Sequence, residues 1–268
     1  MGRLENRVAI VTGAGRGIGR ATAVRLAADG ATVVVNDVDA EPAHETADLI
    51  SQAGGTATVS LANTVELAGA QEMVAQAVQA HGKLDIVVNN AGVTRDKMFH
   101  NLDDETFRFV LDVNLTTAFH TTLAAMPYLR EVAKQELADR GEVAYHRKIT
   151  FTSSVAALTG NPGQYNYTAA KGALIATTKT LARELGPFRI NVNAVAPGFV
   201  ETRLTQPKEG ELGIPEQLRQ AALAMISLGR AGRPEDIANV HAFLVSPDSD
   251  FISGVTIPVT GGQFGGMG

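Results

Sequence analysis

The chain has 268 residues, of which 45% are hydrophobic, and a formal net charge of −5. This length and composition suit one large α/β domain, and we expect residues 1–268 to form it alone. The acidic balance, without a basic block, argues against nucleic acid or an anionic membrane as a partner. The lack of cysteine excludes disulfides, thiolate nucleophiles and thiolate metal sites. No signal-peptide core or membrane-length apolar run is present, so we expect a cytoplasmic protein.

Short β-branched segments alternate with alanine-rich segments of helical period along the whole chain. The predicted strands are 8–12, 31–35, 56–60, 84–88, 148–152, 190–194 and 255–259, and the clearest helices are 19–28, 41–53, 67–80, 164–185 and 234–244. Connections this short between strands and helices require parallel strands with right-handed crossovers. The pattern therefore predicts a Rossmann-type, doubly wound parallel sheet of about seven strands with helices on both faces.

Two stretches interrupt this alternation. Residues 129–147 are highly charged, and we expect them to extend a helix beyond the sheet and to end in solvent. Residues 199–216 contain several Pro and Gly residues after a strand end. A loop of that length in a compact domain is typical of a cover over an active site.

A glycine-rich turn follows the first strand. Its glycines are Gly13, Gly17 and Gly19, whereas Ile18 occupies the position at which the commoner G-x-G-x-x-G spelling has its last glycine. Glycines here permit a tight turn and a close approach of backbone N–H groups to a pyrophosphate at a helix N-terminus. The position of the turn between strand and helix predicts a dinucleotide site.

Acidic and basic residues near this turn favour different dinucleotides. Asp37 ends the second strand, where a carboxylate accepts hydrogen bonds from the adenosine ribose and repels the 2′-phosphate of NADP. Arg16 offers a cation to that phosphate, and Asp39 is an alternative carboxylate. We expect Asp37 to dominate and NAD to be favoured, with NADP possible. Asn63, after the third strand, is a candidate to face the adenine or simply to form a turn.

Tyr167 and Lys171 lie four residues apart in a predicted helix, so the phenol and the ammonium share one face. A free tyrosine has a pKa of about 10, and a neighbouring cation favours the phenolate. Such a pair suits proton exchange with an alcohol or a ketone, although an aromatic ring packed on a lysine stem is also common in helices.

These features occur together in an order that resembles the short-chain dehydrogenase/reductase family. The resemblance covers essentially the whole chain and rests on the glycine turn, the run 89–92 (Asn-Asn-Ala-Gly), Asn114, Ser154, the Tyr167/Lys171 pair and Pro197-Gly198. The stretches 89–96, 161–167 and 196–203 are similar to 3-oxoacyl-acyl-carrier-protein reductases within that family.

The resemblance implies a role for each residue of the site. Tyr167 would be the general acid/base, Ser154 would hold the substrate oxygen, and Lys171 would bind the nicotinamide ribose. Asn114 would kink its helix and hold a water of the proton relay. Further cofactor contacts would come from residues after the fourth and sixth strands: Asn90, Ala91 and Gly92 on the adenosine side, and Pro197, Gly198, Val200 and Thr202 near the nicotinamide.

The resulting hypothesis is an oxidoreductase that moves hydride between a nicotinamide cofactor and a secondary alcohol or ketone, most plausibly a 3-hydroxyacyl or 3-oxoacyl thioester. The alternatives are an NAD-dependent dehydrogenase of a steroid, polyol or other secondary alcohol, and a non-catalytic dinucleotide-binding regulatory protein. Reductases of the similar group mostly use NADPH, which Asp37 disfavours. The six histidines show no paired ligand spacing, so no metal is expected. The family usually forms homotetramers, and we expect one here.

Overall fold

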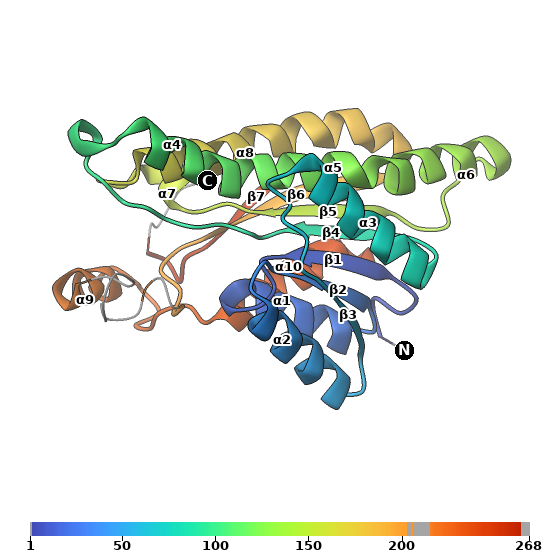
Figure 1. The fold of residues 1–268 in the computed structure, drawn as a ribbon, viewed down its shortest axis with the longest axis horizontal. Helices are drawn as coiled ribbons and strands as arrows, with labels where there is room; N and C mark the ends of the chain where they lie inside the picture. The colour runs from blue at the N-terminus through green and yellow to red at the C-terminus, as the bar shows by residue number, and fades with distance from the viewer. Residues whose placement is uncertain (1, 203–204, 206–214, 264–268) are drawn as a thin grey trace.

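The computed structural model describes residues 2–202, 205 and 215–263, and its centre is one parallel sheet of seven strands in the order β3-β2-β1-β4-β5-β6-β7 (Figure 1). The predicted Rossmann-type sheet is confirmed. The strands are β1 (Val8–Thr12), β2 (Thr32–Asn36), β3 (Thr56–Ser60), β4 (Ile86–Asn89), β5 (Arg147–Thr152), β6 (Ile190–Pro197) and β7 (Thr256–Val259). Both β2 and β4 begin one or two residues later than the sequence pattern indicates.

Helices cover both faces of the sheet, as a doubly wound topology requires (Figure 1). Helices α3 (Leu67–His81), α5 (Thr117–Met126) and α8 (Tyr165–Leu185) pack on one face, and α1 (Gly17–Ala28), α2 (Ala40–Gln52) and α10 (Pro234–Val245) on the other. The remaining helices are α4 (Asp104–Leu111), α6 (Val132–Arg140), α7 (Ala156–Thr159) and α9 (Glu216–Ala224). No helix in these described parts of the chain is long and apolar enough to cross a membrane.

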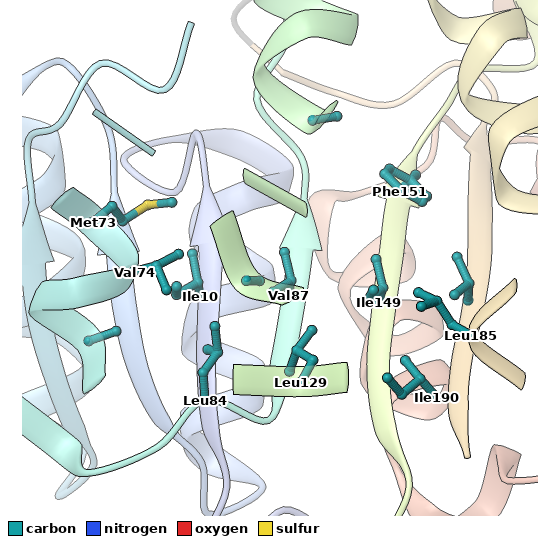
Figure 2. Packing of buried hydrophobic residues seen from close by; sticks show 14 of the residues in the cluster. Ile10, Met73, Val74, Leu84, Val87, Leu129, Ile149, Phe151, Leu185 and Ile190 are labelled. Carbon is teal, nitrogen blue, oxygen red and sulfur yellow. The ribbon is translucent and has the colours of Figure 1, made fainter. Parts of the chain in front are cut away.

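The core follows from the alternation of side chains along buried strands. Ile10 of β1 and Ile149 of β5 face the α3/α5/α8 layer, where they pack with Met73 and Leu129 (Figure 2). The neighbouring β1 residues Ala9 and Val11 face the α1/α2/α10 layer instead. Because both faces are covered, the strands are apolar at nearly every position rather than at every second one.

A long helical segment runs from α4 through α5 to α6, and the sequence pattern did not single out its first half. Two π-helical turns join the three helices, Asp112–Thr116 and Pro127–Glu131. The first contains Asn114, at the place where a kink is expected. The extra residue in a π turn changes the direction of the side chains around it, and Asn114 is buried against the segment after β4.

The charged stretch 129–147 ends its helix in solvent, as expected, and the chain then returns to the sheet. The helix ends at Arg140, Gly141 takes a left-handed conformation with φ 76°, and the chain returns to begin β5 at Arg147. Glu136 accepts two hydrogen bonds from the buried Arg147 guanidinium at 2.9 and 3.0 Å. This buried ion pair anchors the returning chain to the helix that precedes it.

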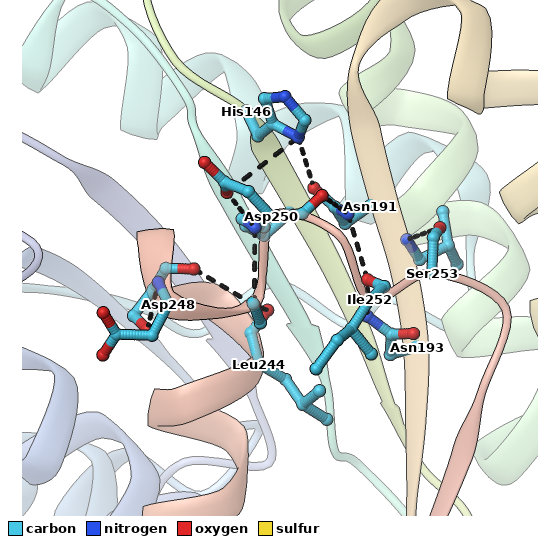
Figure 3. A network of polar contacts seen from close by, with 12 residues as sticks. His146, Asn191, Asn193, Leu244, Asp248, Asp250, Ile252 and Ser253 are labelled. Carbon is cyan, nitrogen blue, oxygen red and sulfur yellow. Dashed lines mark hydrogen bonds and ion pairs between the residues drawn. The ribbon is translucent and has the colours of Figure 1, made fainter.

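Side-chain amides fix the approach to β7 at the same end of the sheet (Figure 3). Asn191 donates to the carbonyls of Asp250 and Ile252 at 2.9 and 3.0 Å, and Asn193 donates to Ile252 at 2.9 Å. These bonds replace the ladder contacts that a loop lacks.

Of the predicted cover 199–216, residues 203–204 and 206–214 lie outside the described residues.

Candidate active site

The glycine turn between β1 and α1 leaves no room for side chains. Gly13 and Gly17 have φ values of 61° and 53°, which favour glycine. A Cβ atom at Gly13 would lie 2.8 Å from the Ala91 Cα, and one at Gly19 would lie 2.0 Å from the Gly13 carbonyl oxygen. The turn, followed by Ile18 in the first turn of α1, thus presents bare backbone at a helix N-terminus, which is a site for an anion such as pyrophosphate.

Asn90 and Ala91, after β4, hold this turn in place. The Asn90 Nδ2 donates to the carbonyls of Thr12 and Gly13 at 3.1 and 3.2 Å. The Thr12 hydroxyl oxygen accepts from the backbone N–H groups of Asn90 and Ala91 at 3.0 and 3.1 Å. Two segments distant in sequence therefore form one rigid edge of the candidate dinucleotide site.

The acidic residues expected at the ribose end lie beside the turn. Asp37 accepts hydrogen bonds from the backbone N–H groups of Gly15 at 2.9 Å and Asp39 at 3.1 Å, and it is only partly buried. Arg16 forms an ion pair with Asp39 at 2.5 Å. Asn63 is exposed and accepts from the N–H of Val65 at 3.2 Å, which is turn chemistry. The cation that would attract a 2′-phosphate is thus already paired with a carboxylate.

Helix α8 and the end of β5 bring Tyr167 and Ser154 together. Burial raises the pKa of the Tyr167 phenol, a hydrogen bond with the Ser154 side chain lowers it, and the Asp96 carboxylate raises it, with a net increase. The backbone N–H of Val155 donates to the Pro197 carbonyl at 2.9 Å, which fixes the Ser154 segment against β6. In the free protein the phenol is therefore protonated at neutral pH.

Lys171 is buried, one turn further along α8. Its Nζ donates to the Thr152 carbonyl at 2.8 Å, and burial lowers its pKa to about 7. The Nζ lies 5.7 Å from the centre of the Tyr167 ring. The sequence predicted that this cation would acidify the phenol, but the free protein does not show that effect, because burial disfavours the charged forms of both groups.

Asn114 places an amide oxygen beside Lys171. Its Nδ2 donates to the carbonyls of Val93 and Val110, both at 2.9 Å, whereas its buried Oδ1 has no partner. A Cβ atom at Gly92 would lie 2.5 Å from this Oδ1 and 3.0 Å from the Lys171 Nζ. The missing side chain at Gly92 therefore leaves a small polar space between an unsatisfied acceptor and a cation, which suits a bridging water.

The segment after β6 closes over the glycine turn. Gly198 donates its N–H to the Val259 carbonyl at 2.9 Å, and Val200 is buried in a bridge to Gly232. Thr202 lies beside Gly17, because a Cβ there would be 3.6 Å from the threonine methyl carbon. Of the residues predicted around the nicotinamide, Thr202 lies next to the turn and Val200 shares an apolar cluster with Ile18.

Sequence reasoning missed Thr152 and Ser153, which hold the lysine. Thr152 supplies the carbonyl for Nζ, and the Ser153 hydroxyl donates to the Lys171 carbonyl at 2.8 Å. The run of hydroxyl residues at the end of β5 was the available signal. Among the residues that the structure describes, no cluster of three or more acidic or histidine side chains is placed to bind a metal ion.

Comparison with known proteins agrees with this geometry. The model of a family described as Enoyl-(Acyl carrier protein) reductase matches residues 13–263. The chain is 38% identical to the 3-oxoacyl-[acyl-carrier-protein] reductase FabG of Thermotoga maritima, over 97% of this chain and 98% of the relative. It is 39% identical to the (3R)-3-hydroxyacyl-CoA dehydrogenase of Rattus norvegicus, over 98% of each chain.

A solved structure shows the same fold. A putative short-chain alcohol dehydrogenase from Sinorhizobium meliloti superposes with a TM-score of 0.86 at 32% identity and covers 97% of each chain. This chain belongs to the short-chain dehydrogenase/reductase family, a class of NAD(P)-dependent oxidoreductases.

Proposed function

We propose that the protein interconverts a 3-hydroxyacyl and a 3-oxoacyl thioester with a nicotinamide cofactor. The observation that carries the proposal is the convergence of the Tyr167 phenol, the Ser154 hydroxyl and the buried Lys171 amine next to a bare glycine turn. A protein that only bound a dinucleotide would have no use for a paired phenol and hydroxyl. The names of the relatives supply the thioester part of the proposal.

The residues present fit a dinucleotide. The pyrophosphate would bind at Gly13, Gly17 and Gly19. Asp37 would bind the adenosine ribose, and Lys171 would bind the nicotinamide ribose. The adenosine half would be bordered by Asn63, Asn90, Ala91 and Gly92, and the nicotinamide half by Pro197, Gly198, Val200 and Thr202. When bound, the cofactor would give or take hydride at the substrate carbon.

The chain itself supplies proton chemistry. In the reduction, Tyr167 would donate its phenolic proton to the substrate oxygen, and Ser154 would hold that oxygen by a second hydrogen bond. The raised pKa of Tyr167 keeps the proton available at neutral pH. The Asn114 Oδ1 and the Lys171 Nζ face the same polar space, so a water there would return a proton toward the phenol.

The preferred cofactor under this proposal is NAD. Asp37 presents a carboxylate to the ribose, and Asp39 neutralises Arg16. With NAD favoured, kcat/KM for NAD should exceed that for NADP by roughly ten- to a hundred-fold, and Asp37→Ala should narrow the ratio. Equal or better use of NADP by the unmodified enzyme would contradict this choice.

The substrate class is tested with purified protein. Turnover should be measured with 3-oxoacyl and 3-hydroxyacyl thioesters of both acyl carrier protein and coenzyme A, and with steroids, polyols and simple secondary alcohols. The proposal expects thioesters to give the highest kcat/KM. A steroid or polyol with a higher kcat/KM than the thioesters would contradict the proposed substrate class but would leave the proposed hydride and proton transfer unchanged.

We also propose a cytoplasmic homotetramer with two-fold axes. Helix α5 exposes Phe119 and Leu123, which are 58% and 44% exposed, on a layer shared with α8. Apolar side chains on a helix face suit contact with a second copy. Light scattering at micromolar protein should give the mass of four chains, and the mass of a single chain would refute the assembly.

A further inference from the structure

A buried histidine links β5 to α10 on the face of the sheet opposite α8. His241 has no exposed surface, its Nδ1 lies 2.9 Å from the Thr150 hydroxyl, and its Nε2 lies 3.1 Å from the Thr152 hydroxyl. The Thr152 hydroxyl in turn lies 3.1 Å from the Asn90 Oδ1. None of the proposed proton-transfer steps uses this histidine.

Backbone carbonyls determine the direction of every hydrogen bond in this network. The Asn90 amide faces the carbonyls of Thr12 and Gly13, which only accept, so the group there is Nδ2 and the Oδ1 faces Thr152. Because Oδ1 only accepts, the single proton of the Thr152 hydroxyl is donated to Asn90. The Thr152 oxygen must then accept from His241, whose Nε2 therefore carries the proton.

The other ring nitrogen completes the assignment. A neutral imidazole with its proton on Nε2 has an acceptor at Nδ1, and the Thr150 hydroxyl is the donor that faces it. Burial lowers the pKa of His241 to about 3, so the ring is neutral at physiological pH. Every hydroxyl, amide and ring nitrogen in the network is satisfied in this one arrangement.

We propose that His241 is a positioning residue for the dinucleotide-binding turn. As the Nε2–H tautomer it donates a hydrogen bond to the Thr152 hydroxyl oxygen, which directs the Thr152 hydroxyl proton toward the Asn90 Oδ1. The oriented Asn90 amide then holds the carbonyls of Thr12 and Gly13 in place. The inference rests on the proposed function only in that the turn binds a dinucleotide.

Thr152 also joins the two halves of the site. Its hydroxyl serves the glycine turn through Asn90, and its carbonyl accepts from the Lys171 Nζ at 2.8 Å. Removing the hydroxyl leaves that carbonyl in place. Loss of the His241 network should therefore weaken cofactor binding more than it slows the proton steps.

Two conservative variants on the same strand face separate positioning from stability. Thr152→Val removes the hydroxyl between His241 and Asn90, whereas Thr150→Val removes a hydroxyl from the same ring on the side away from the turn. Each change deletes one hydroxyl and leaves one ring nitrogen without its partner, but Thr152→Val also leaves the Asn90 Oδ1 without its donor and should therefore lower thermal stability more. Cofactor affinity of the folded protein is the readout that separates positioning from stability. The dissociation constant for the preferred dinucleotide, measured by titration, should rise about tenfold in Thr152→Val and less than about twofold in Thr150→Val.

Steady-state kinetics and a double variant that also removes the His241 ring extend the test. Thr152→Val should raise KM for the cofactor by a larger factor than it lowers kcat. The double variant Thr152→Val/His241→Leu should bind the cofactor no more weakly than Thr152→Val alone, because both changes break one path. Equal weakening in Thr150→Val and Thr152→Val, or no weakening in Thr152→Val, would overturn the inference.

Nitrogen-15 NMR spectra of histidine-labelled wild-type protein report the tautomer of His241 directly, so this measurement does not depend on the stability of a variant. The His241 signals, identified by their absence from His241→Leu, should show a protonated Nε2 and an unprotonated Nδ1 at neutral pH. A protonated Nδ1 would overturn the direction of the network. Wild-type protein that bound neither NAD nor NADP would instead contradict the proposed function, which distinguishes the two failures.

Discussion

The two ends of the sheet bury a cation in opposite ways. Lys171 and Arg147 are each 3% exposed. Arg147, at the amino end of β5, meets both oxygens of Glu136, and although burial lowers its pKa, the Glu136 hydrogen bond and charge produce a net increase. Lys171, near the carboxyl end, meets only a carbonyl, and burial lowers its pKa to about 7.

The difference separates a structural charge from a functional one. A buried cation with a bidentate carboxylate keeps its charge and holds two segments together. A buried amine without a carboxylate changes its protonation near neutral pH, which a site for proton transfer needs. Under the proposed function, the same sheet supports stability at one end and chemistry at the other, where the buried Asn114 Oδ1 also has no partner.

The largest expected effect is at the chemical end. Tyr167→Phe should lower kcat by about 10²–10⁴-fold, because the substrate oxygen loses its proton donor. Cofactor affinity, measured by titration, should stay within about twofold of wild type, since the phenol does not hold the turn. Near wild-type turnover would move the acid/base role elsewhere, and Tyr165 on the same helix is the residue to test next.

At the structural end the effect should appear in stability alone. Glu136→Gln leaves Arg147 without its carboxylate, and the free energy of unfolding at pH 7 should fall by about 2–3 kcal/mol with kcat unchanged. Glu131→Gln is the matched control on the same helical segment, because Glu131 pairs with Arg130 at the surface and should matter by less than about 0.5 kcal/mol. Equal losses in urea unfolding would show that the buried pair is no stronger than the exposed one.

The pH dependence of that pair has a fixed sign. The Arg147 side chain lowers the pKa of Glu136 below its ordinary 4.5. The unfolded chain therefore binds a proton first as the pH falls, and the stabilisation present above about pH 4.5 is lost below it. Glu136→Gln should lack this part of the acid sensitivity.

The sharpest test of the comparison is a change in slope, and it concerns Lys171 in the cofactor-free protein. Its folded pKa of about 7 lies below the unfolded value of 10.5, so between these pH values the unfolded chain binds more protons. Stability should consequently rise with pH in this window, on the order of 1 kcal/mol per pH unit, relative to Lys171→Met. Lys179→Met, on the exposed side of α8, should retain the wild-type slope. Parallel curves for wild type and Lys171→Met would show that the amine keeps its ordinary pKa.

The fold class and the residues of the candidate site could be predicted from the sequence alone. Strand segments buried on both faces are continuously apolar, and the turn between β1 and α1 needs glycines, so both features are visible without any tertiary contact. The four-residue spacing of Tyr167 and Lys171 is likewise a property of one helix.

Properties that depend on partners from distant segments could not be predicted in this way and are visible only in the folded structure. The pKa of Lys171 follows from burial under other elements. The Asn114 Oδ1 lacks a hydrogen-bond donor at the place where α8 and the segment after β4 meet, and Arg147 pairs with a residue of the preceding helix. The sequence pattern gave no indication of the role of His241, because its two threonine partners lie about 90 residues earlier in the chain. Burial and hydrogen-bond direction are set by what surrounds a side chain, and no local pattern records that.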